Sequence, residues 1–545
     1  MTAASGSGHE IGLPGLDDEL RRLDELARGV AAAWSSRTLA ATTMGRERAL
    51  LRLFGVSGLD RSGLPLAGSV VDRFVGSSRE RLADGVSLPF AMALVEYDVS
   101  PLRLAVDIAD GLIDLEREAE LLVDPDHRAR AEAAVSGLVA GAIARIDANR
   151  TARRELCAVL GDPAGPWVAT AIQEHAAGGA AAEVRDLAQA GFDVLRIEVP
   201  MGRELSGLLE AAGQEVAPWR PGGAGRGDAD PLGGSSADDE APAGSQRGLA
   251  AIRRAADEAA ATRRGYVRLA SAAPPLAAPE QAVVAAFERV DLVVADAMAE
   301  IVSSGVDPDR ALADHAFGAA LHRRAGTMVL IGPGPLVVGP DLSRGRPSDV
   351  ATRSGRALAL QLLAVHLARG SGLPAEQLVV GAVPASLAAE RLGAALSLAE
   401  VALRRRLLPE HGLWFTTGDA DEGSTGPSLS QIGGLLPADA AAMLQVSATH
   451  RPGSDPGEAA GAARTVLATG TMLARSRTGV QLDGPALDHA RATAAAAVQA
   501  LDGLAGAGWR SILGEDFDDA ERRRFGADAV TERTESNHPL RQLLG

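Results

Sequence analysis

Apolar positions in the first third of the chain recur with the period of a helix. At the start they fall three or four residues apart, at Leu20, Leu23, Leu26 and Val30. This pattern predicts helices over 16–54, 66–83, 88–109 and 129–148. No strand is predicted before Gly165. The sequence therefore predicts a helical N-terminal region over 16–160 that follows a flexible N-terminus at 1–15.

Beyond Gly165 the pattern changes to short apolar runs that alternate with helical stretches. The predicted strands are Trp167–Ile172, Phe192–Val199, Tyr266–Leu269, Val290–Ala295, Thr327–Ile331, Leu378–Val380, Leu413–Thr417 and Met443–Val446. The predicted helices between them are 179–190, 248–262, 279–288, 296–323, 350–370, 384–406 and 428–442. Eight such alternations are typical of an α/β protein with a (β/α)8 TIM barrel, here over 161–455. A doubly wound sheet is the alternative, because alternation does not decide whether the sheet closes.

Two further segments complete the predicted organisation. Residues 217–247 consist mostly of Gly, Pro, Ser, Asp and Ala, so they are predicted to be a disordered insertion in the barrel. Helices are predicted over 456–476 and 484–504, followed by a charged tail at 514–545. The region 456–545 is therefore predicted to be a helical C-terminal extension.

Charge and cysteine content narrow the classes of partner and compartment. The formal net charge of −17 makes nucleic acid and anionic membranes unfavourable partners. The single cysteine, Cys157, excludes an internal disulfide and suits a reducing cytoplasm. No apolar run reaches the roughly 18 residues of a membrane span, and the polar first residues predict no signal peptide. We therefore expect a cytoplasmic protein without a membrane segment.

The chain contains no lysine, since all 54 of its basic residues are arginines. An imine to pyridoxal phosphate or to a carbonyl substrate needs an amine that can lose its proton, and a guanidinium cannot provide one. A P-loop lysine is excluded in the same way. Any amine nucleophile must therefore come from another chain.

In a TIM barrel the loops after the strands carry the chemistry. The candidate cofactor-binding residues there are Gly202, Arg203, Arg268, Ser271, Asp296 and Gly332. Structural alternatives stay open: Arg203 can pair with Glu204, Asp296 can cap the following helix, and Gly332 can serve a turn. Glu174 and His175 could form an acid/base pair, but neighbours on a strand point to opposite faces. No catalytic residue is assigned, and no metal-binding motif is present.

Several segments, in matching order and spacing, resemble the lysine 5,6-aminomutase alpha (large) subunit family. The segments are Thr42–Met44, Glu47–Val56, Leu64–Leu66, Val70–Asp72, Asn149–Arg150, Gly165–Pro166, Ala190–Val194, Gly265–Leu269, Glu288–Asp291, Asp296–Ala297, Gly372–Gln377 and Asn537–Leu540. The resemblance implies a TIM barrel that works with a small cobalamin-binding beta subunit in a hetero-oligomer. That partner brings adenosylcobalamin and the lysine that anchors pyridoxal phosphate. The implied reaction is a radical 1,2-amino migration on lysine or a similar diamino acid.

The sequence departs from the family where pyridoxal phosphate would bind. The family's phosphate-binding R-T-T-G-Q-S falls on Val199–Glu204, which keeps only Gly202. Its stacking Tyr falls at Ala299 and the following Arg at Ser304; its serine after the third strand falls at Pro274, although Ser271 is close. Two hypotheses follow: an aminomutase component, or a divergent cobalamin-associated barrel that has lost pyridoxal phosphate. The second could be another isomerase component or a noncatalytic regulatory or scaffold subunit.

Overall fold

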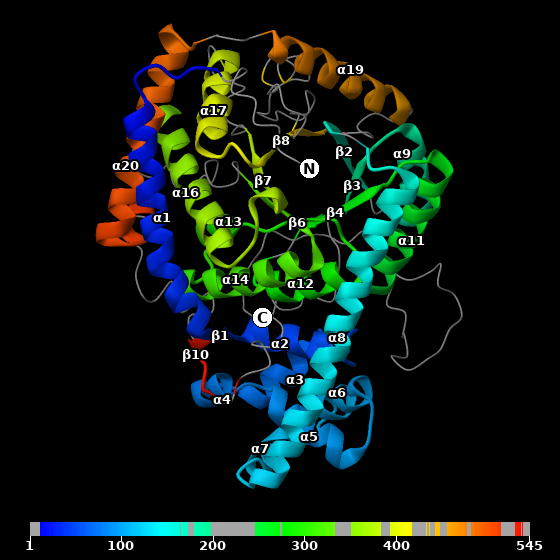
Figure 1. Ribbon diagram of the computed structural model, residues 1–545. Coiled ribbons are helices and arrows are strands. Elements are labelled where there is room, and N and C mark those ends of the chain that lie inside the picture. The colour runs from blue at the N-terminus through cyan, green and yellow to red at the C-terminus, as the bar shows by residue number, and fades with distance from the viewer. Residues whose placement is uncertain are drawn as a thin grey trace.

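Eight parallel strands close into a barrel in the computed structural model of the chain (Figure 1). The strands are β2 (Trp167–Ile172), β3 (Val194–Ile197), β4 (Arg268–Ala272), β5 (Leu292–Val294), β6 (Met328–Ile331), β7 (Leu378–Gly381), β8 (Gly412–Thr416) and β9 (Ala442–Gln445). Each pairs with the next along the chain, and β9 pairs with β2. The predicted TIM barrel is confirmed, and the doubly wound alternative is wrong because the sheet closes.

The structure describes residues 11–163, 165–172, 179–197, 246–272, 275–332, 350–382, 393–416, 432, 435, 442–446, 455–476, 481–513, 529–535 and 537. The predicted helix 428–442 and the predicted insertion lie almost wholly outside these residues. Gln246 and Arg247, at the end of the predicted insertion, instead begin a helix.

Alternate side chains of each strand fill the inside of the barrel. The inner cluster is Trp167, Ala169, Val194, Ala270, Leu292, Leu330, Val379, Trp414 and Met443. The residues between them, such as Val168 and Leu195, belong to a separate core under the surrounding helices. Both faces of every strand are therefore buried, as the continuous apolar runs of the sequence predict.

Helices surround the barrel. They are α9 (Ala180–Ala190), α11 (Gln246–Arg263), α12 (Ala278–Phe287), α13 (Ala297–Ser304), α14 (Pro308–Ala325), α16 (Val350–Gly370), α17 (Gly393–Leu407), α19 (Pro456–Arg475), α20 (Gly484–Ala507) and α21 (Arg510–Leu513). The single predicted helix 296–323 is wrong. Gly305 ends α13 in a left-handed conformation, and Asp307 and Pro308 begin α14.

The predicted helix 16–54 is also interrupted. Helix α1 (Asp17–Ala40) runs beside α16 and α20, and α2 (Met44–Leu53) follows strand β1 (Ala41–Thr43). Strand β1 pairs antiparallel with β10 (Val530–Glu532), which lies in the predicted charged tail. The expectation of no strand before Gly165 is therefore wrong. The partner of β1 is nearly 500 residues away, so local periodicity could not reveal the pairing.

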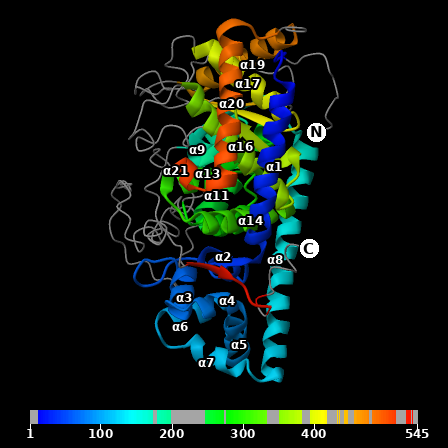
Figure 2. The same cartoon turned by 90° about the vertical axis from the view of Figure 1, so that its left-hand side faces the viewer.

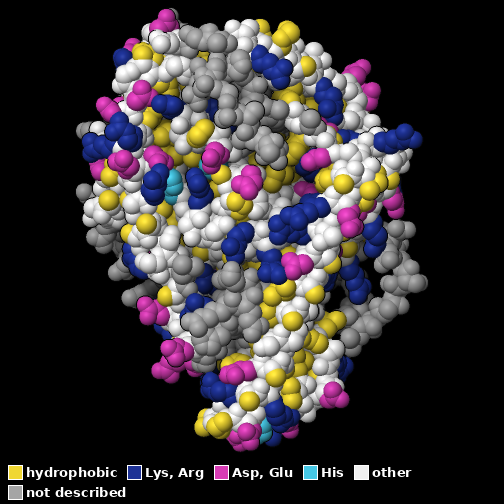
Figure 3. Space-filling view, in the orientation of Figure 1, with side chains coloured by type: hydrophobic (Ala, Val, Ile, Leu, Met, Phe, Trp, Pro, Cys, Tyr) yellow, Lys and Arg dark blue, Asp and Glu magenta, His cyan; other side chains and the backbone are white. Residues whose placement is uncertain are grey.

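The N-terminal helices form a second core beside the barrel (Figure 2). They are α3 (Leu66–Val75), α4 (Arg79–Asp84), α5 (Ser87–Tyr97), α6 (Pro101–Ala109), α7 (Leu115–Leu121) and α8 (Pro125–Leu160). Helix α8 extends from this core along the barrel to β2 (Figure 1). Hydrophobic side chains gather on the molecular surface along its lower half (Figure 3).

Buried arginines of α2 connect the helical core to the barrel. Arg48 Nε lies 2.9 Å from Glu280 Oε2 on α12, and Arg52 Nε lies 2.8 Å from Glu280 Oε1. Burial alone would raise the pKa of Glu280, but the two guanidinium groups outweigh burial and hold that pKa below its usual value. Glu280 is therefore the shared anion of a buried ion cluster.

Replacing Glu280 removes the charge that compensates two buried cations. We expect Glu280→Gln to lower the free energy of unfolding by about 3–5 kcal/mol, seen as a lower urea midpoint by circular dichroism. The matched control is Glu258→Gln, whose ion pair with Arg185 is exposed and should contribute at most about 1 kcal/mol. Equal midpoints for the two variants would contradict the assigned role of Glu280.

Candidate functional site

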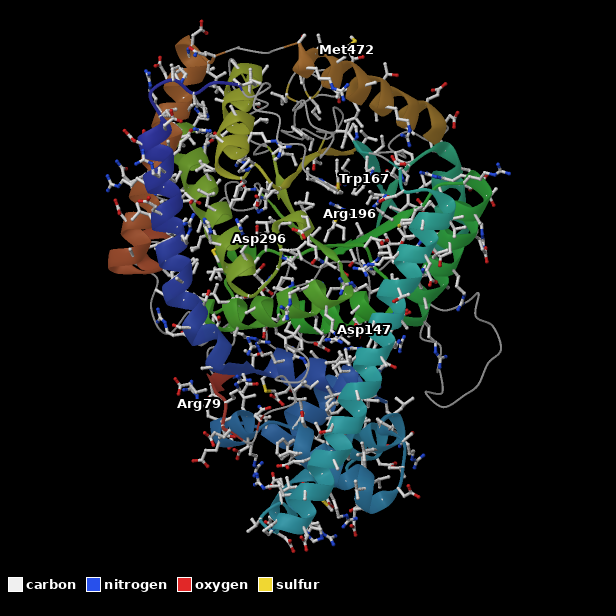
Figure 4. All side chains as sticks on the ribbon, viewed as in Figure 1. Arg79, Asp147, Trp167, Arg196, Asp296 and Met472 are labelled. Atoms are coloured by element: carbon white, nitrogen blue, oxygen red, sulfur yellow. The ribbon has the colours of Figure 1, made fainter. Side chains whose placement is uncertain are left out.

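An arginine lies inside the barrel near the carboxyl ends of the strands. Arg196 follows Val194 of the inner cluster by two residues, so its side chain also faces inward. Its Nη1 donates to Oε1 of Gln445 on β9, at 3.2 Å. Figure 4 shows Arg196 within the ring of strands. Arg196 was not among the predicted site residues; its signal was a charge within an otherwise apolar strand.

The inward positions around Arg196 are small or neutral. Ala171 of β2 and Ala270 of β4 lie beside it in the strand register. On β8, Trp414 Nε1 donates to Thr416 Oγ1 at 3.2 Å. The described inward neighbours of Arg196 thus include methyl, hydroxyl and amide groups.

Asp296 and Gly332 lie close together, because Asp296 follows the end of β5 and Gly332 follows the end of the neighbouring strand β6. Asp296 caps α13: its Oδ1 accepts from the amides of Met298 at 3.0 Å and Ala299 at 3.2 Å. Burial raises the pKa of Asp296 to about 6, against the opposing effects of these amides, His315 and the Gly332 amide. The cap interpretation thus accounts for its position.

An acid–histidine pair joins α13 and α14. His315 Nε2 lies 2.8 Å from Glu300 Oε2, and the other Glu300 oxygen accepts from the Leu276 amide. Burial alone would lower the pKa of His315, but the hydrogen bond and charge of Glu300 raise it. His315 lines a cavity with Val329 and Ile331. Because those two side chains belong to the outer core, this cavity lies outside the barrel wall and away from its mouth.

Arg268 was predicted to lie at the carboxyl end of a strand. It instead begins β4, at the opposite end of the barrel. Its Nη2 pairs with Asp162, and its guanidinium lies 3.6 Å from the centre of the Trp167 ring. The physical reason is that the strand extends three residues beyond the predicted Leu269. Arg268 therefore closes the base of the barrel.

Ser271 lies near the carboxyl end of β4 but faces away from the barrel interior. Its hydroxyl oxygen accepts from Gln281 Nε2 of α12 at 2.7 Å, and the residue is fully buried. Ala270 before it faces inward, so alternation turns Ser271 toward the helices. Its predicted cofactor contact is not supported by this geometry.

Other predicted candidates fall outside the described residues. These are Gly202, Arg203, Glu174 and His175, together with the positions aligned with most of the family's phosphate contacts. Two aligned positions are described: Ala299 and Ser304, in α13. Neither supplies the aromatic face or the cation that the family uses, so these described positions do not fit pyridoxal phosphate as that family holds it.

The described residues contain neither a candidate metal site nor a candidate membrane-spanning helix. No group of three or more His, Cys, Asp or Glu side chains there is placed to hold a metal ion. No helix in that part of the chain has the length and apolarity needed to cross a membrane.

Fold and site define the class: a TIM-barrel protein with its candidate binding groups at the carboxyl ends of the strands. Residues 16–423 match the family model of the TIM-barrel domain of the D-lysine 5,6-aminomutase alpha subunit. The chain belongs to this family. The lysine 5,6-aminomutase alpha subunit of Fusobacterium nucleatum is 25% identical over 415 residues, covering 75% of this chain and 73% of that protein. That of Acetoanaerobium sticklandii is 24% identical over 340 residues, covering 62% and 59%.

The raised pKa of Asp296 predicts that the free energy of unfolding falls as the pH rises. The folded chain holds this proton more tightly than the unfolded chain, so the stabilisation is complete below pH about 4 and is lost as pH rises through about 6. Asn is an equally good neutral cap. We expect Asp296→Asn to be more stable relative to wild type at pH 7.5 than at pH 4.5, by about 2 kcal/mol.

Urea unfolding at both pH values measures this difference. The control is Asp114→Asn at the solvent-exposed cap of α7, where Asp114 accepts from the Glu116 amide. That exchange replaces a capping carboxylate by an amide at a site where burial plays no part. An Asp296→Asn effect that is independent of pH would show that burial does not act on this carboxyl as described.

Proposed function

We propose that this chain is the large-subunit component of an adenosylcobalamin-dependent aminomutase in the cytoplasm. The reaction is an isomerisation that moves an amino group between adjacent carbons of lysine or a similar diamino acid. The observation that carries the proposal is the extent of the family match, residues 16–423, which includes the barrel from β2 to β8. The part of the chain that would enclose a substrate is therefore the part that resembles the family.

A separate small subunit would hold the cofactor. When bound, adenosylcobalamin supplies the radical that removes a hydrogen atom from the substrate. The 545 residues contain no lysine, so any imine-forming amine would have to come from outside them. The role left to this chain is to bind and orient the substrate and to exclude water, which the apolar barrel interior suits.

A second candidate function is a cobalamin-associated barrel that no longer uses pyridoxal phosphate. The observation that favours it is the pair Ala299 and Ser304 at positions where the family has a stacking Tyr and an Arg. Such a chain could serve another isomerase, or it could regulate or support a related enzyme. The two functions differ in whether turnover requires pyridoxal phosphate.

Reconstitution with a cobalamin-binding partner tests both functions. The full chain would be co-expressed with a small subunit that carries the D-x-H-x-x-G cobalamin motif, and co-elution would be measured by size-exclusion chromatography. The complex would then receive adenosylcobalamin and 13C-labelled lysine or ornithine, with and without pyridoxal phosphate. We expect co-elution and an NMR-detected isomer with a shifted amino group, formed only when both cofactors are present.

Each other outcome has a defined meaning. Turnover without pyridoxal phosphate would support the second candidate function. Co-elution without turnover of either substrate would contradict the aminomutase proposal, and lack of co-elution would contradict a shared complex. Omitting adenosylcobalamin is the control for contaminating activity.

A further inference from the structure

The cavity outside the barrel wall lies between α14, α16 and strand β6. Most of its wall is aliphatic: Val329 and Ile331 of β6 line it, together with alanines and leucines of the two helices. Its volume is about 40 Å³. A single water needs roughly 10–15 Å³, so the cavity has room for a molecule of about three to five non-hydrogen atoms.

A buried histidine without hydrogen bonds lines this cavity. His322 of α14 is 2% exposed, and neither of its ring nitrogens has a hydrogen-bond partner among the described residues. The Nε2 side of the ring faces Gly318, another lining residue, where an added Cβ would lie 3.8 Å from Nε2. Burial, together with the charge of His315, lowers the pKa of His322 to about 3, so the ring is neutral near pH 7.

The charges and hydroxyl groups of the cavity indicate what kind of molecule fits. His315 also lines it, and its charge is compensated by Glu300 at 2.8 Å. The lining residues that the structure describes include no Asp, Glu or Arg. Thr38 and Ser371 each donate their hydroxyl hydrogen to a backbone carbonyl three or four residues earlier, so their oxygens remain as acceptors. An ion would lose its hydration here without a charged partner, whereas a neutral group that donates a hydrogen bond would be satisfied.

We propose that this cavity is a binding site for a small neutral molecule that has an aliphatic body and one hydroxyl or carboxamide group, and that this group hydrogen-bonds to Nε2 of His322. A hydroxyl or carboxamide both donates and accepts, so it fits either tautomer of the ring. The carbon chain of the molecule lies against the aliphatic wall. Because the cavity is separate from the barrel mouth, the inference does not depend on the proposed function.

Ligand-observed NMR of the full chain, without cofactor or partner, tests the site. The probes are 1-propanol and propionamide, compared with propionate and propylammonium, which have a carbon chain of the same length and carry a charge. We expect saturable signals from the two neutral probes, with dissociation constants on the order of millimolar for molecules of this size. The charged probes should bind at least tenfold more weakly.

Two variants connect this binding to the cavity. His322→Leu removes the ring nitrogens but keeps an apolar side chain of similar size, so the affinity for the neutral probes should fall at least tenfold. Ala316→Leu enlarges a side chain of the cavity wall and leaves His322 in place, so it should abolish binding by filling the space.

The matched control is His411→Leu. His411 is also 2% exposed with both ring nitrogens unpaired among the described residues, but it does not line the cavity. Both histidine variants remove an unpaired buried polar ring, so both should raise the thermal midpoint. Only His322→Leu should change the affinity for the probes.

Three results would overturn the inference. The first is no saturable binding of either neutral probe, which would mean that only water occupies the cavity. The second is unchanged affinity in both His322→Leu and Ala316→Leu. The third is charged probes that bind as tightly as propionamide. An equal loss of affinity in His411→Leu would also contradict the site, because it would trace the effect to the fold as a whole.

Discussion

The structure depends on the alternation of side chains along eight short parallel strands. In a closed barrel one set of side chains fills the interior and the other packs under the helices, so a polar group on either set is enclosed. Alternation places Arg196 in the mouth and turns Ser271 toward Gln281 of α12. A shift of one residue would exchange the two sets, and the inner and outer cores together prevent such a shift.

A second constraint follows from the composition: because the chain has no lysine, every permanently charged cation that joins two elements is a guanidinium. Arg48 and Arg52 share Glu280 between α2 and α12. Arg404 on α17 pairs with Glu400, which also contacts His489 of α20 and thereby connects α20 to α17. The several donors of a guanidinium can satisfy a carboxylate and a backbone carbonyl at once, as Arg404 does with Gly381. A buried arginine can therefore join two elements while its guanidinium donates hydrogen bonds to groups on both of them.

The sequence predicts the barrel well because its strands are buried on both faces and are therefore distinct apolar runs. It predicts long-range features poorly: the β1–β10 pair depends on a segment at the far end of the chain, and the break after Gly305 depends on caps within a helical pattern. For the site, the positions of Asp296 and Gly332 directly after predicted strands were enough to predict that they lie close together. The sequence did not predict that β4 begins at Arg268, nor that Ser271 faces the helices rather than the barrel interior.

The distribution of family resemblance between the two ends of the barrel has a physical explanation. The segments Ala190–Val194, Gly265–Leu269 and Glu288–Asp291 lead into β3, β4 and β5 at the base. There Asp193 pairs with Arg263 and Arg464, and Asp291 pairs with Arg153 and Arg253. Ala299 and Ser304, where the resemblance implies a Tyr and an Arg, lie in α13 beyond the carboxyl end of β5. Residues at the base of a TIM barrel maintain the fold, whereas residues at the mouth select the ligand. A chain that keeps the first set and changes the second keeps its barrel while the ligand groups around its mouth change.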